Sequence, residues 1–464
     1  MTIQPKLTQS VWKKFYKLNN YYHQDTEALV KRMIPLDASV LEFGCKGGEL
    51  LRSLPNKVKV GVATHQDLYK LAQKRLGSKK VVLPEYFFNK MNRSKFGYIV
   101  LSHTLSEVND AQELINKIKN VTHEDSRVVV VLFNFLWKPV LDLAEKLGLR
   151  LPQTKEPNWW TENDIDNLFY LEGYEKIKSG KRFIFPYNLG VVSHFINKYL
   201  TPLPLLNYLT LTNYAVYKPI SDHRELSVSI VIPARNESGN MKSIFKKIPL
   251  ISPEMEIIFV EGHSTDDTYD VIKNEIKKYK GPIKTRLLKQ KGKGKGDAVR
   301  LGFSKASNDL LMILDADLTV DPQELVKFYN AAVNGKGDLI MGSRLIYPME
   351  RQAMRLLNYF GNKFFSVAFT FLLGQTIKDT LCGTKVILKK NYEKIAENRK
   401  VFGNFDPFGD YDLIFGASNI NLKITEVPIR YKERTYGKTN ISRFRHGLLL
   451  LRMVYFAAKN LKFV

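Results

Sequence analysis

The sequence predicts two α/β domains, each built on a doubly wound parallel sheet. At 464 residues the chain is longer than one hydrophobic core usually supports. Strand-like runs alternate with helical patterns in both halves, and helical crossovers between strands predict parallel sheets. The boundary falls in YAVYKPISDHREL (214–226), where a proline and polar residues separate two strand patterns. The expected domains are residues 1–222 and 223–464.

The predicted strands follow one another along the chain as short apolar runs bounded by glycine, proline or polar residues. In the first half they are SVLEFG, KVGVA, YIVLS and RVVVVLF. In the second half they are LSVSIVIP, EIIFVEG, LLMILDAD and DLIMGS. Thr161, followed by the acidic run ENDIDNLF, predicts a helix that starts at residue 162.

Composition indicates a globular, strongly basic protein. Apolar residues make up 44% of the chain, and the formal net charge is +25. Residues 1–222 carry 31 Lys and Arg against 21 Asp and Glu, and residues 223–464 carry 40 against 25. This charge favours nucleic acid, a nucleotide-bearing substrate or an anionic membrane as partner, with a merely soluble basic protein as the alternative. Two cysteines, Cys45 and Cys382, exclude a disulfide framework and suit a reducing cytoplasm.

Two apolar stretches bear on membrane contact. The N-terminal residues lack the apolar core of a signal peptide. No stretch reaches the roughly 20 apolar residues that a spanning helix needs. Residues 364–374 (FFSVAFTFLLG) and 447–458 (GLLLLRMVYFAA) come close and are flanked by Lys or Arg. They are expected to be either buried helices or helices that lie in a membrane interface.

Three successive strand-to-turn units in the second half carry polar residues where a strand ends. They are SIVIPARNESGNM (229–241), FVEGHSTDDT (259–268) and LLMILDADLTVDP (310–322). Open α/β sheets bind ligands at these strand ends and at the helix N-termini that follow them. The run KQKGKGKGDAVRLG (289–302) adds lysines and small residues that suit a diphosphate, although a solvated lysine loop remains the alternative.

Asp315 and Asp317 are the sharpest feature of these turns. Residues i and i+2 of an extended chain point the same way, so the two carboxylates repel unless a cation lies between them. Mg²⁺ or Mn²⁺ commonly binds through one or two carboxylates together with substrate phosphates. The pair therefore predicts a divalent metal that carries a nucleotide diphosphate.

From about Leu226 onward the chain resembles a family 2 glycosyltransferase with the GT-A fold. The resemblance is strongest to the dolichyl- or polyprenyl-phosphate mannose synthase branch. It rests on VIPARNESGNM, VEGHSTDDT, KGKGDAVR, LDADLTVDP, MGSRL, DTLCGTKVI and EVPIRYKERTYGKTNIS, in this order. It implies a nucleotide-sugar donor, a divalent metal and an inverting transfer.

The resemblance also implies roles for matching residues. Asp315 and Asp317 would hold the metal and the diphosphate. Positions expected to line the nucleotide are Pro233, Arg235, Glu237 and Glu261. The strand-end and lysine-rich motifs add His263, Lys291 and Lys295 as donor-binding candidates. Leaving-group and acceptor phosphates would be contacted by Arg344, Arg355 and Arg434, of which Arg355 and Arg434 are the acceptor-binding candidates.

Three positions depart from the family pattern. Gly262 stands in the second place of an acidic pair, so the nucleotide base is left open. Thr319 stands where some members use a side-chain amide as a further metal ligand. Asn440 replaces a lysine in the terminal loop, which leaves the acceptor contacts there open.

The acceptor decides whether a general base is needed. A polyprenyl phosphate oxygen is already anionic near neutral pH and needs none. A sugar hydroxyl needs a carboxylate, for which Asp410, Asp412 and Asp379 are candidates. Capping of a helix by the turn FGDYDL (408–413) is the alternative reading. Arginines followed by the apolar stretch 364–374 favour the lipid phosphate.

The first half resembles a class I S-adenosylmethionine-dependent methyltransferase at SVLEFGCKGGELLRSL (39–54). Candidate cofactor contacts are Glu42, Gly44 and Gly48. Lys46, however, occupies the middle glycine position, where its side chain would crowd the ligand or force the turn out of a left-handed conformation. Ala63 stands where the family has a ribose-binding acid, and Gly97 where an Asp often begins the fourth strand. Binding of S-adenosylmethionine is therefore not expected.

The whole chain resembles bacterial fusions of a methyltransferase-like half with a family 2 glycosyltransferase half, which act in surface polysaccharide or glycolipid assembly. The resemblance implies transfer of a hexose from a nucleotide-diphosphate sugar to a polyprenyl phosphate. The expected location is cytoplasmic, in peripheral contact with the anionic inner face of the plasma membrane. Transfer to a saccharide hydroxyl and a second, methylating activity are the alternatives. No basic-aromatic recognition module supports nucleic-acid binding.

Overall fold

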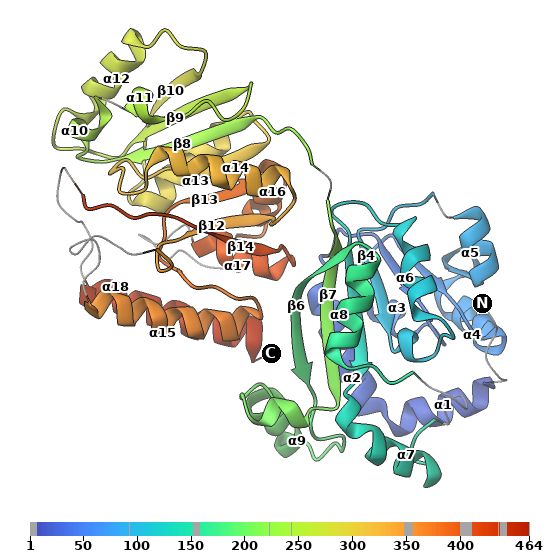
Figure 1. The fold of residues 1–464 in the computed structure, drawn as a ribbon. Helices are drawn as coiled ribbons and strands as arrows, with labels where there is room; N and C mark the ends of the chain where they lie inside the picture. Colours follow the sequence, from blue (N-terminus) through green and yellow to red (C-terminus); the bar gives the residue numbers. More distant parts are fainter. Residues whose placement is uncertain are drawn as a thin grey trace. The chain divides into compact units, whose positions relative to one another are not determined.

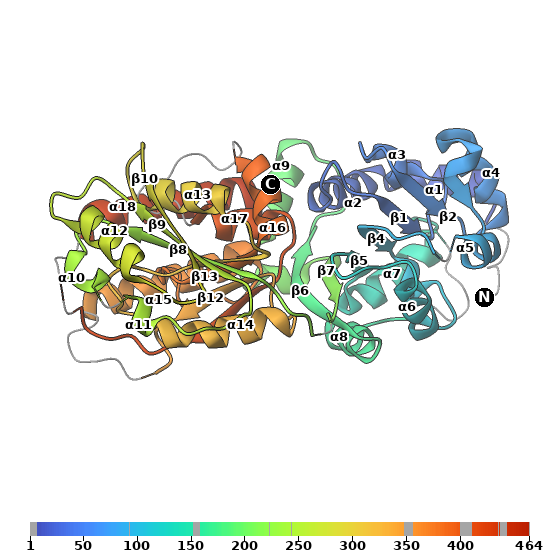
Figure 2. The same ribbon diagram turned by 90° about the horizontal axis from the view of Figure 1, so that it is seen from above.

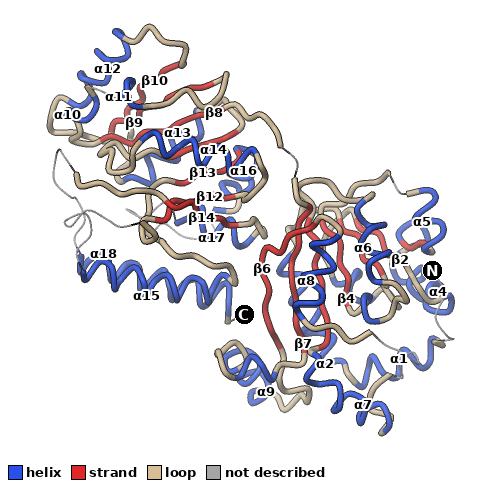
Figure 3. The backbone as a smooth tube through the Cα atoms, viewed as in Figure 1, coloured by secondary structure: helices blue, strands red, loops and turns tan. Residues whose placement is uncertain are grey.

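The computed structural model describes residues 7–91, 93–151, 158–221, 223–242, 244–347, 356–399, 411–434, 436 and 443–463. The chain divides into two compact units. Unit 1 comprises Met1–Ile220 with Phe463–Val464, and unit 2 comprises Ser221–Lys462. Figure 1 labels the elements of both, and Figure 3 separates their helices from their strands.

Unit 1 is built on a seven-stranded sheet in the order β3-β2-β1-β4-β5-β7-β6. The first five strands in the chain are parallel, whereas β7 runs antiparallel to both β5 and β6. The predicted parallel sheet is therefore confirmed, with an antiparallel pair added at one edge. The strands are β1 (Val40–Phe43), β2 (Lys59–Val62), β3 (Val81–Val82), β4 (Tyr98–Ser102), β5 (Arg127–Phe133), β6 (Tyr174–Arg182) and β7 (Thr212–Pro219).

Helices cover both faces of this sheet, because its strands are apolar on both sides. One core packs β-strand residues against α5, α6 and α8, and the other packs them against α2 and α3. Figure 2 shows these helix layers on either side of the strands. The helices are α1 (Gln9–Leu18), α2 (Asn20–Met33), α3 (Glu49–Ser53), α4 (Gln66–Leu76), α5 (Pro84–Lys90), α6 (Ala111–Lys119), α7 (Lys138–Lys146), α8 (Glu162–Leu171) and α9 (Val191–Phe195).

The start of α8 confirms the helix signal read at Thr161. The Thr161 hydroxyl accepts a hydrogen bond from the Asp164 backbone N–H, and the Asp164 carboxylate accepts one from the Thr161 backbone N–H. This reciprocal capping box satisfies two backbone donors that the first helical turn leaves unpaired.

Unit 2 is also built on a seven-stranded sheet, in the order β10-β9-β8-β11-β13-β12-β14. The run β10-β9-β8-β11 is parallel, and β13 is antiparallel to both β11 and β12. The carboxyl ends of β8, β9 and β11 therefore meet at one edge. The strands are β8 (Val228–Ala234), β9 (Met255–Glu261), β10 (Lys284–Lys289), β11 (Leu310–Ile313), β12 (Leu339–Ser343), β13 (Lys385–Leu388) and β14 (Ile424–Pro428).

Two helix layers enclose the sheet of unit 2. One core draws on α13, α15, α16, α17 and α18, and the other on α10, α11, α12 and α14. The helices are α10 (Ser238–Met241), α11 (Ile244–Lys247), α12 (Thr268–Lys278), α13 (Lys295–Lys305), α14 (Leu325–Val333), α15 (Leu356–Leu373), α16 (Lys389–Glu397), α17 (Tyr411–Asn419) and α18 (Arg443–Ala457).

The two apolar stretches singled out in the sequence lie within α15 and α18, which pack against each other. One side of each helix is buried, as at Phe369 and Met453. The other side exposes large apolar side chains, among them Phe364, Val367 and Tyr455. Among the described residues, no helix has the length and hydropathy needed to cross a bilayer.

Candidate functional site

The predicted site lies where β8, β9 and β11 end. The first two turns are held together by hydrogen bonds: the Asn236 backbone N–H donates to Ser264 Oγ at 3.1 Å, and the Thr265 N–H donates to Asn236 Oδ1 at 2.8 Å. Asn236 and His263 both adopt left-handed backbone conformations, with φ of 57°. Such conformations occur mostly in tight turns. Both turns lie at the same edge of the sheet.

Glu261 and His263 belong to the second of these turns. Glu261 is buried, and its Oε1 accepts from the Ser264 N–H at 2.6 Å. His263 Nε2 lies 2.8 Å from the Gly292 carbonyl oxygen in the lysine-rich loop. Gln290 Nε2 donates to the Gly294 carbonyl at 2.8 Å, so this loop is attached at two points to the rim of the site. Gln290 was not among the predicted site residues.

Basic side chains accompany the carboxylate pair that follows β11. Lys295 Nζ lies 2.5 Å from Asp315 Oδ1. An Arg434 terminal nitrogen donates to Asp317 Oδ2 at 2.7 Å, while Asp317 Oδ1 accepts from the Thr319 hydroxyl at 2.8 Å. Two positive side chains thus offset the repulsion between the two carboxylates.

Arg434 reaches the site from far along the chain. After β14, Tyr431 forms an antiparallel bridge with Val320, and the Lys432 N–H donates to the Thr319 carbonyl at 2.9 Å. These contacts bring Arg434 over the turn, where its second terminal nitrogen donates to Glu237 Oε1 at 2.8 Å. Arg434 was predicted to bind the acceptor; the structure brings it to Asp317 and Glu237, the first a metal candidate and the second a donor-binding candidate.

Glu237 lies almost fully inside the protein. It is 7% exposed, and its second carboxylate oxygen accepts from Asn240 Nδ2 at 2.7 Å. Burial raises the pKa of Glu237, although the nearby Arg434 guanidinium acts in the opposite direction. Burial likewise opposes the charge of Arg434, but Asp317 and Glu237 together raise the pKa of this arginine. The three groups form one coupled cluster.

Of the remaining donor-binding candidates, Arg235 and Lys291 are exposed, and Pro233 is half-buried at the end of β8. Lys295 begins α13, whose N-cap is Gly294. The backbone of Gly383 lies so close to Asp315 and Lys295 that a Cβ atom there would overlap both side chains. Gly383 was not predicted as a site residue; only its place in the resembling segment DTLCGTKVI pointed to it.

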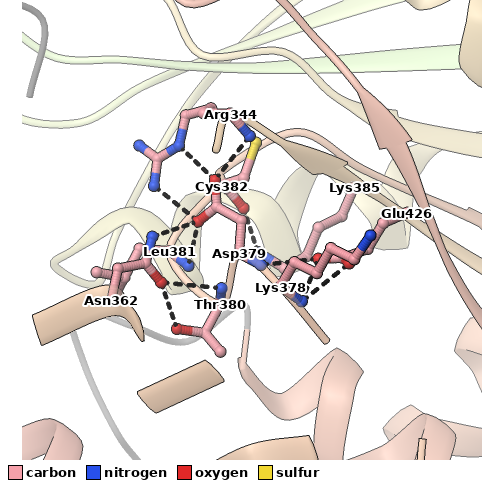
Figure 4. A network of polar contacts seen from close by, with 9 residues as sticks. All are labelled: Arg344, Asn362, Lys378, Asp379, Thr380, Leu381, Cys382, Lys385 and Glu426. Atoms are coloured by element: carbon pink, nitrogen blue, oxygen red, sulfur yellow. Dashed lines mark hydrogen bonds and ion pairs between the residues drawn. The ribbon is translucent and has the colours of Figure 1, made fainter. Parts of the chain in front are cut away.

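Arg344 is held in a buried ion pair (Figure 4). Its Nε donates to Asp379 Oδ2 at 2.7 Å, and a terminal nitrogen donates to Asp379 Oδ1 at 2.9 Å. The Arg344 side chain is 11% exposed and that of Asp379 is fully buried. Asn362 Nδ2 and the Leu381 N–H also donate to Asp379 Oδ1, at 2.8 and 3.1 Å. Although burial opposes the charged form, Arg344 and these hydrogen bonds lower the pKa of Asp379 to about 2.

The described general-base candidates, Asp412 and Asp379, contact arginines and not Asp315 or Asp317. Asp412 is buried in α17 and faces Arg399 and Arg300, at 3.2 and 3.6 Å. Asp379 is committed to Arg344. Asp410 and the acceptor-binding candidate Arg355 lie outside the described residues.

A divalent metal suits the donor set at Asp315 and Asp317. Both carboxylates are partly exposed, and carboxylate oxygens combined with substrate phosphates are typical ligands of Mg²⁺ and Mn²⁺. In the described parts of the chain, no group of three or more His, Cys, Asp or Glu side chains converges on a metal position. The remaining ligands would come from donor phosphates and water.

In unit 1 the glycine-rich turn after β1 keeps its expected backbone. Gly44 and Gly48 have φ of 81° and 80°, and Lys46 between them has φ of 46°. The lysine therefore does not force the turn out of the left-handed conformation, and that part of the expectation was wrong. Lys46 instead pairs with Glu107 at 2.6 Å and lies over the Trp12 ring, 5.4 Å from its centroid.

The space beside this turn is small. A cavity of about 50 Å³ is lined by Glu42, Gly44 and Lys46, together with aromatic side chains of α1 and α2. That volume holds a few water molecules, whereas S-adenosylmethionine is a nucleoside with an amino-acid tail. The Trp12 indole N–H donates to Glu49 Oε1 at 2.9 Å and keeps α1 over the turn. Ala63, where a ribose-binding acid would stand, is fully buried. Lys46 and Ala63 thus stand where the family resemblance implies a glycine and a ribose-binding acid.

Comparison with known families assigns a class to each unit. Residues 229–396 match the family described as glycosyl transferase family 2. Residues 16–179 match the family described as a methyltransferase domain. One segment of the chain thus matches a methyltransferase domain and another matches a family 2 glycosyltransferase, as the sequence resemblance implied.

Three curated relatives are similar to part of this chain. The low-salt glycan biosynthesis hexosyltransferase Agl6 of Haloferax volcanii is 28% identical over 227 residues, which cover 48% of this chain and 51% of that protein. The dolichol-phosphate mannosyltransferase of Pyrococcus furiosus is 35% identical over 123 residues, covering 26% and 34%. The dolichyl-phosphate beta-glucosyltransferase ALG5C of Trichomonas vaginalis is 28% identical over 263 residues, covering 53% and 74%. The chain spans about half of the first relative and a third of the second.

Proposed function

We propose that this chain is an inverting, metal-dependent hexosyltransferase that moves a sugar from a nucleotide diphosphate to a polyprenyl phosphate. The observation that carries the proposal is the convergence of three strand ends, bearing Glu237, Glu261 and the pair Asp315 and Asp317, with Lys295 and Arg434 beside them. The family 2 match and the dolichyl-phosphate acceptors named for two relatives support the same reading.

The residues divide into three tasks in this proposal. Arg235, Glu237, Glu261 and His263 line the nucleotide at the ends of β8 and β9. Lys295, at the N-terminus of α13, receives the diphosphate, because exposed N–H groups and a lysine charge both favour anions there. Bound Mg²⁺ or Mn²⁺ at Asp315 and Asp317 would help to neutralise the leaving diphosphate.

Lys295 and Arg434 stabilise the transition state electrostatically. An acceptor phosphate oxygen forms a bond to the sugar C1 as the bond from C1 to the diphosphate oxygen breaks, so negative charge grows on the leaving group. The two basic side chains already lie beside Asp315 and Asp317, which would hold the metal, and they need little reorganisation to meet that charge.

The described base candidates outside the strand-end cluster favour a phosphate acceptor, because they are buried and paired. Asp412 and Asp379 are both buried and paired with arginines, so neither is placed to take a proton from a sugar hydroxyl. An acceptor phosphate is anionic at neutral pH and needs no base. Transfer to a saccharide would require Asp410 or another group.

The acceptor also suggests where the chain meets a membrane. Exposed Phe360, Phe364 and Val367 follow one another at helical spacing along α15, and Leu448, Leu451 and Tyr455 do the same along α18. Such a helix pair, with Arg452 exposed on α18 and Lys459 exposed just after it, suits the interface of an anionic bilayer. We place the enzyme at the cytoplasmic face of the plasma membrane in peripheral contact.

Residues 1–222, in this proposal, form a methyltransferase-like domain that no longer binds S-adenosylmethionine, and residues 223–464 form the transferase. The small cavity at Glu42 and the buried Ala63 support the loss. Calorimetric titration of the full chain with S-adenosylmethionine should release no binding heat. Saturable binding would contradict this part of the proposal.

The donor is tested by titrating the full chain with GDP and UDP, each with and without Mn²⁺. One nucleotide should bind in a metal-dependent way, and Asp317→Ala should abolish the metal dependence. Asp270→Ala, which removes an exposed carboxylate from α12, serves as the matched control and should bind like the wild type. Absence of binding to both nucleotides would refute the transferase.

A further inference from the structure

The methyltransferase-like unit carries a large insertion at the carboxyl edge of its sheet. Strands β6 and β7 are antiparallel neighbours whose last and first residues, Arg182 and Thr212, face each other in register. Hairpin loops usually have two to about five residues. Here residues 183–211 intervene and include α9 and two further short helical turns, Ile196–Leu200 and Leu206–Leu209.

Hydrogen bonds between residues of the insertion hold its backbone in place. Asn197 is buried; its Oδ1 accepts from the N–H groups of Ile184 and Phe185, and its Nδ2 donates to the Phe185 carbonyl at 2.9 Å. Ser193 is also buried and accepts from the Leu189 N–H at 3.0 Å. These polar contacts order the backbone of the insertion together with the buried Phe183 and Leu211.

Many other large apolar side chains of the insertion are exposed. Val191 and Leu205 are each 85% exposed. Further exposed apolar or aromatic residues of the insertion include Tyr187, Leu189, Phe195 and Tyr208. Soluble proteins rarely gather so many exposed large apolar residues in one short segment without a partner.

A second apolar stripe lies at the same end of the unit. Leu136, Val140, Leu143 and Leu147 are all exposed and recur at helical spacing through α7 and the turn before it. The Trp137 indole N–H donates to the Leu209 carbonyl at 2.8 Å and ties this stripe to the insertion. Figure 1 shows α7 and α9 at the same end of the sheet. We call the exposed apolar residues of 135–149 and 183–211 the apolar end.

The charged residues in and around the insertion indicate which kind of surface the apolar end binds. No acidic residue occurs between Glu175 and Asp222, whereas this interval holds six Lys and Arg. Within the insertion itself the ionisable residues of basic type are Lys198 and His194. Exposed tyrosines beside aliphatic side chains are typical of the boundary between lipid headgroups and acyl chains. The insertion carries no acid and bears Lys198 and His194, which complements an anionic bilayer, while the α7 stripe carries Asp142, paired with Lys138, and Glu145.

We propose that the apolar end of the methyltransferase-like unit docks onto anionic lipid bilayers. This inference goes beyond the transferase activity and does not depend on it. The unit retains a methyltransferase-type sheet, and its ligand-binding edge bears the membrane surface.

Vesicle flotation of the full chain tests this. The probes are vesicles of phosphatidylcholine alone and of phosphatidylcholine mixed with phosphatidylglycerol. Wild type should float with the anionic vesicles and less with the neutral ones. Val191→Asp/Leu205→Asp should lower partitioning into anionic vesicles at least about tenfold, because a charge replaces each inserted side chain.

The control is Leu36→Asp/Tyr170→Asp, which changes two residues that are 71% and 69% exposed and precede β1 and β6, at the opposite edge of the sheet. It should float like wild type. Unchanged tryptophan fluorescence would show that unit 1 of each variant is folded. Equal flotation of the Val191→Asp/Leu205→Asp variant and the control would overturn the proposal.

Light scattering separates a protein partner from a lipid one. If the Val191→Asp/Leu205→Asp variant loses self-association but not flotation, the apolar end joins copies of the chain and the proposal fails. Titration of the same variant with nucleotide and Mn²⁺ separates membrane binding from donor binding. Its nucleotide affinity should equal that of the wild type. If the wild type binds no nucleotide, the proposed function is refuted. Flotation still tests membrane binding by the apolar end independently.

Discussion

The buried pair of Arg344 and Asp379 offers the sharpest test of how unit 2 is held together. Asp379→Asn keeps the shape of the side chain and one oxygen acceptor for the Leu381 N–H, but it removes the charge that faces Arg344. The guanidinium is then left largely buried without its counter-ion. Breaking a buried pair from one side costs about 3–5 kcal/mol of the free energy of unfolding.

The pKa of Asp379 gives a second measure of the same interaction. It falls from the ordinary 3.8 to about 2 in the folded protein. A depression of that size corresponds to about 2.5 kcal/mol of stability. Because the folded-state pKa is lowered, this contribution is complete above about pH 4 and is lost as the pH falls toward 2. The variant should show none of this loss.

Urea unfolding of the full chain can separate the two units. All four tryptophans, at positions 12, 137, 159 and 160, lie in unit 1, so their fluorescence reports that unit alone. Far-UV circular dichroism reports both units. Asp379→Asn should shift the dichroism transition that is silent in fluorescence and leave the fluorescence midpoint unchanged.

Two comparisons decide the reasoning. Arg344→Met/Asp379→Asn removes both charges and should recover at least half of the lost stability, since no lone buried charge remains. Glu275→Gln, which breaks the exposed pair of Glu275 and Lys278, should cost less than about 0.5 kcal/mol. A cost below about 1 kcal/mol for Asp379→Asn, or no recovery in the double variant, would refute the account.

Three further outcomes are expected. Burial, with a smaller contribution from Glu49, raises the pKa of Glu42 from 4.5 to about 8. The folded protein therefore loses stability as the pH rises from about 5 to 8, by on the order of 4 kcal/mol. Glu42→Gln should remove this pH dependence from the unfolding midpoint of unit 1 measured by fluorescence. Gly383→Ala should weaken metal-dependent nucleotide binding at least about tenfold in calorimetry, because a Cβ overlaps Asp315 and Lys295, and binding equal to wild type would show that the loop yields. Arg434→Gln should lower kcat with vesicle-borne polyprenyl phosphate by about 10²–10³, with a smaller change in nucleotide affinity; an unchanged kcat would remove Arg434 from the reaction.

Much of this protein is determined locally in the sequence. Apolar runs followed by polar turns define β8, β9 and β11, and the parallel pairing that helical crossovers impose is enough to bring Glu237, Glu261 and Asp315 to one edge. The capping box at Thr161 is equally local. These features depend on residues within a few positions of one another, and periodicity and capping chemistry express them directly.

Only the tertiary structure decided which charges meet. Arg434 contacts Asp317 across 117 positions of sequence, because the chain after β14 pairs with Val320. Arg344, predicted to contact a phosphate, pairs with Asp379 across 35 positions in a buried ion pair. Such pairings depend on where distant segments pack, and no local pattern records that.

The same division holds in unit 1. The sequence shows a glycine-rich turn with a lysine in it, but only packing shows that Lys46 keeps a positive φ while α1 and its Trp12 occupy the space beside it. Likewise, the apolar letters of residues 183–211 do not say which side they face. A buried and an exposed valine look alike in sequence, and exposure is decided by which elements the fold brings to cover them.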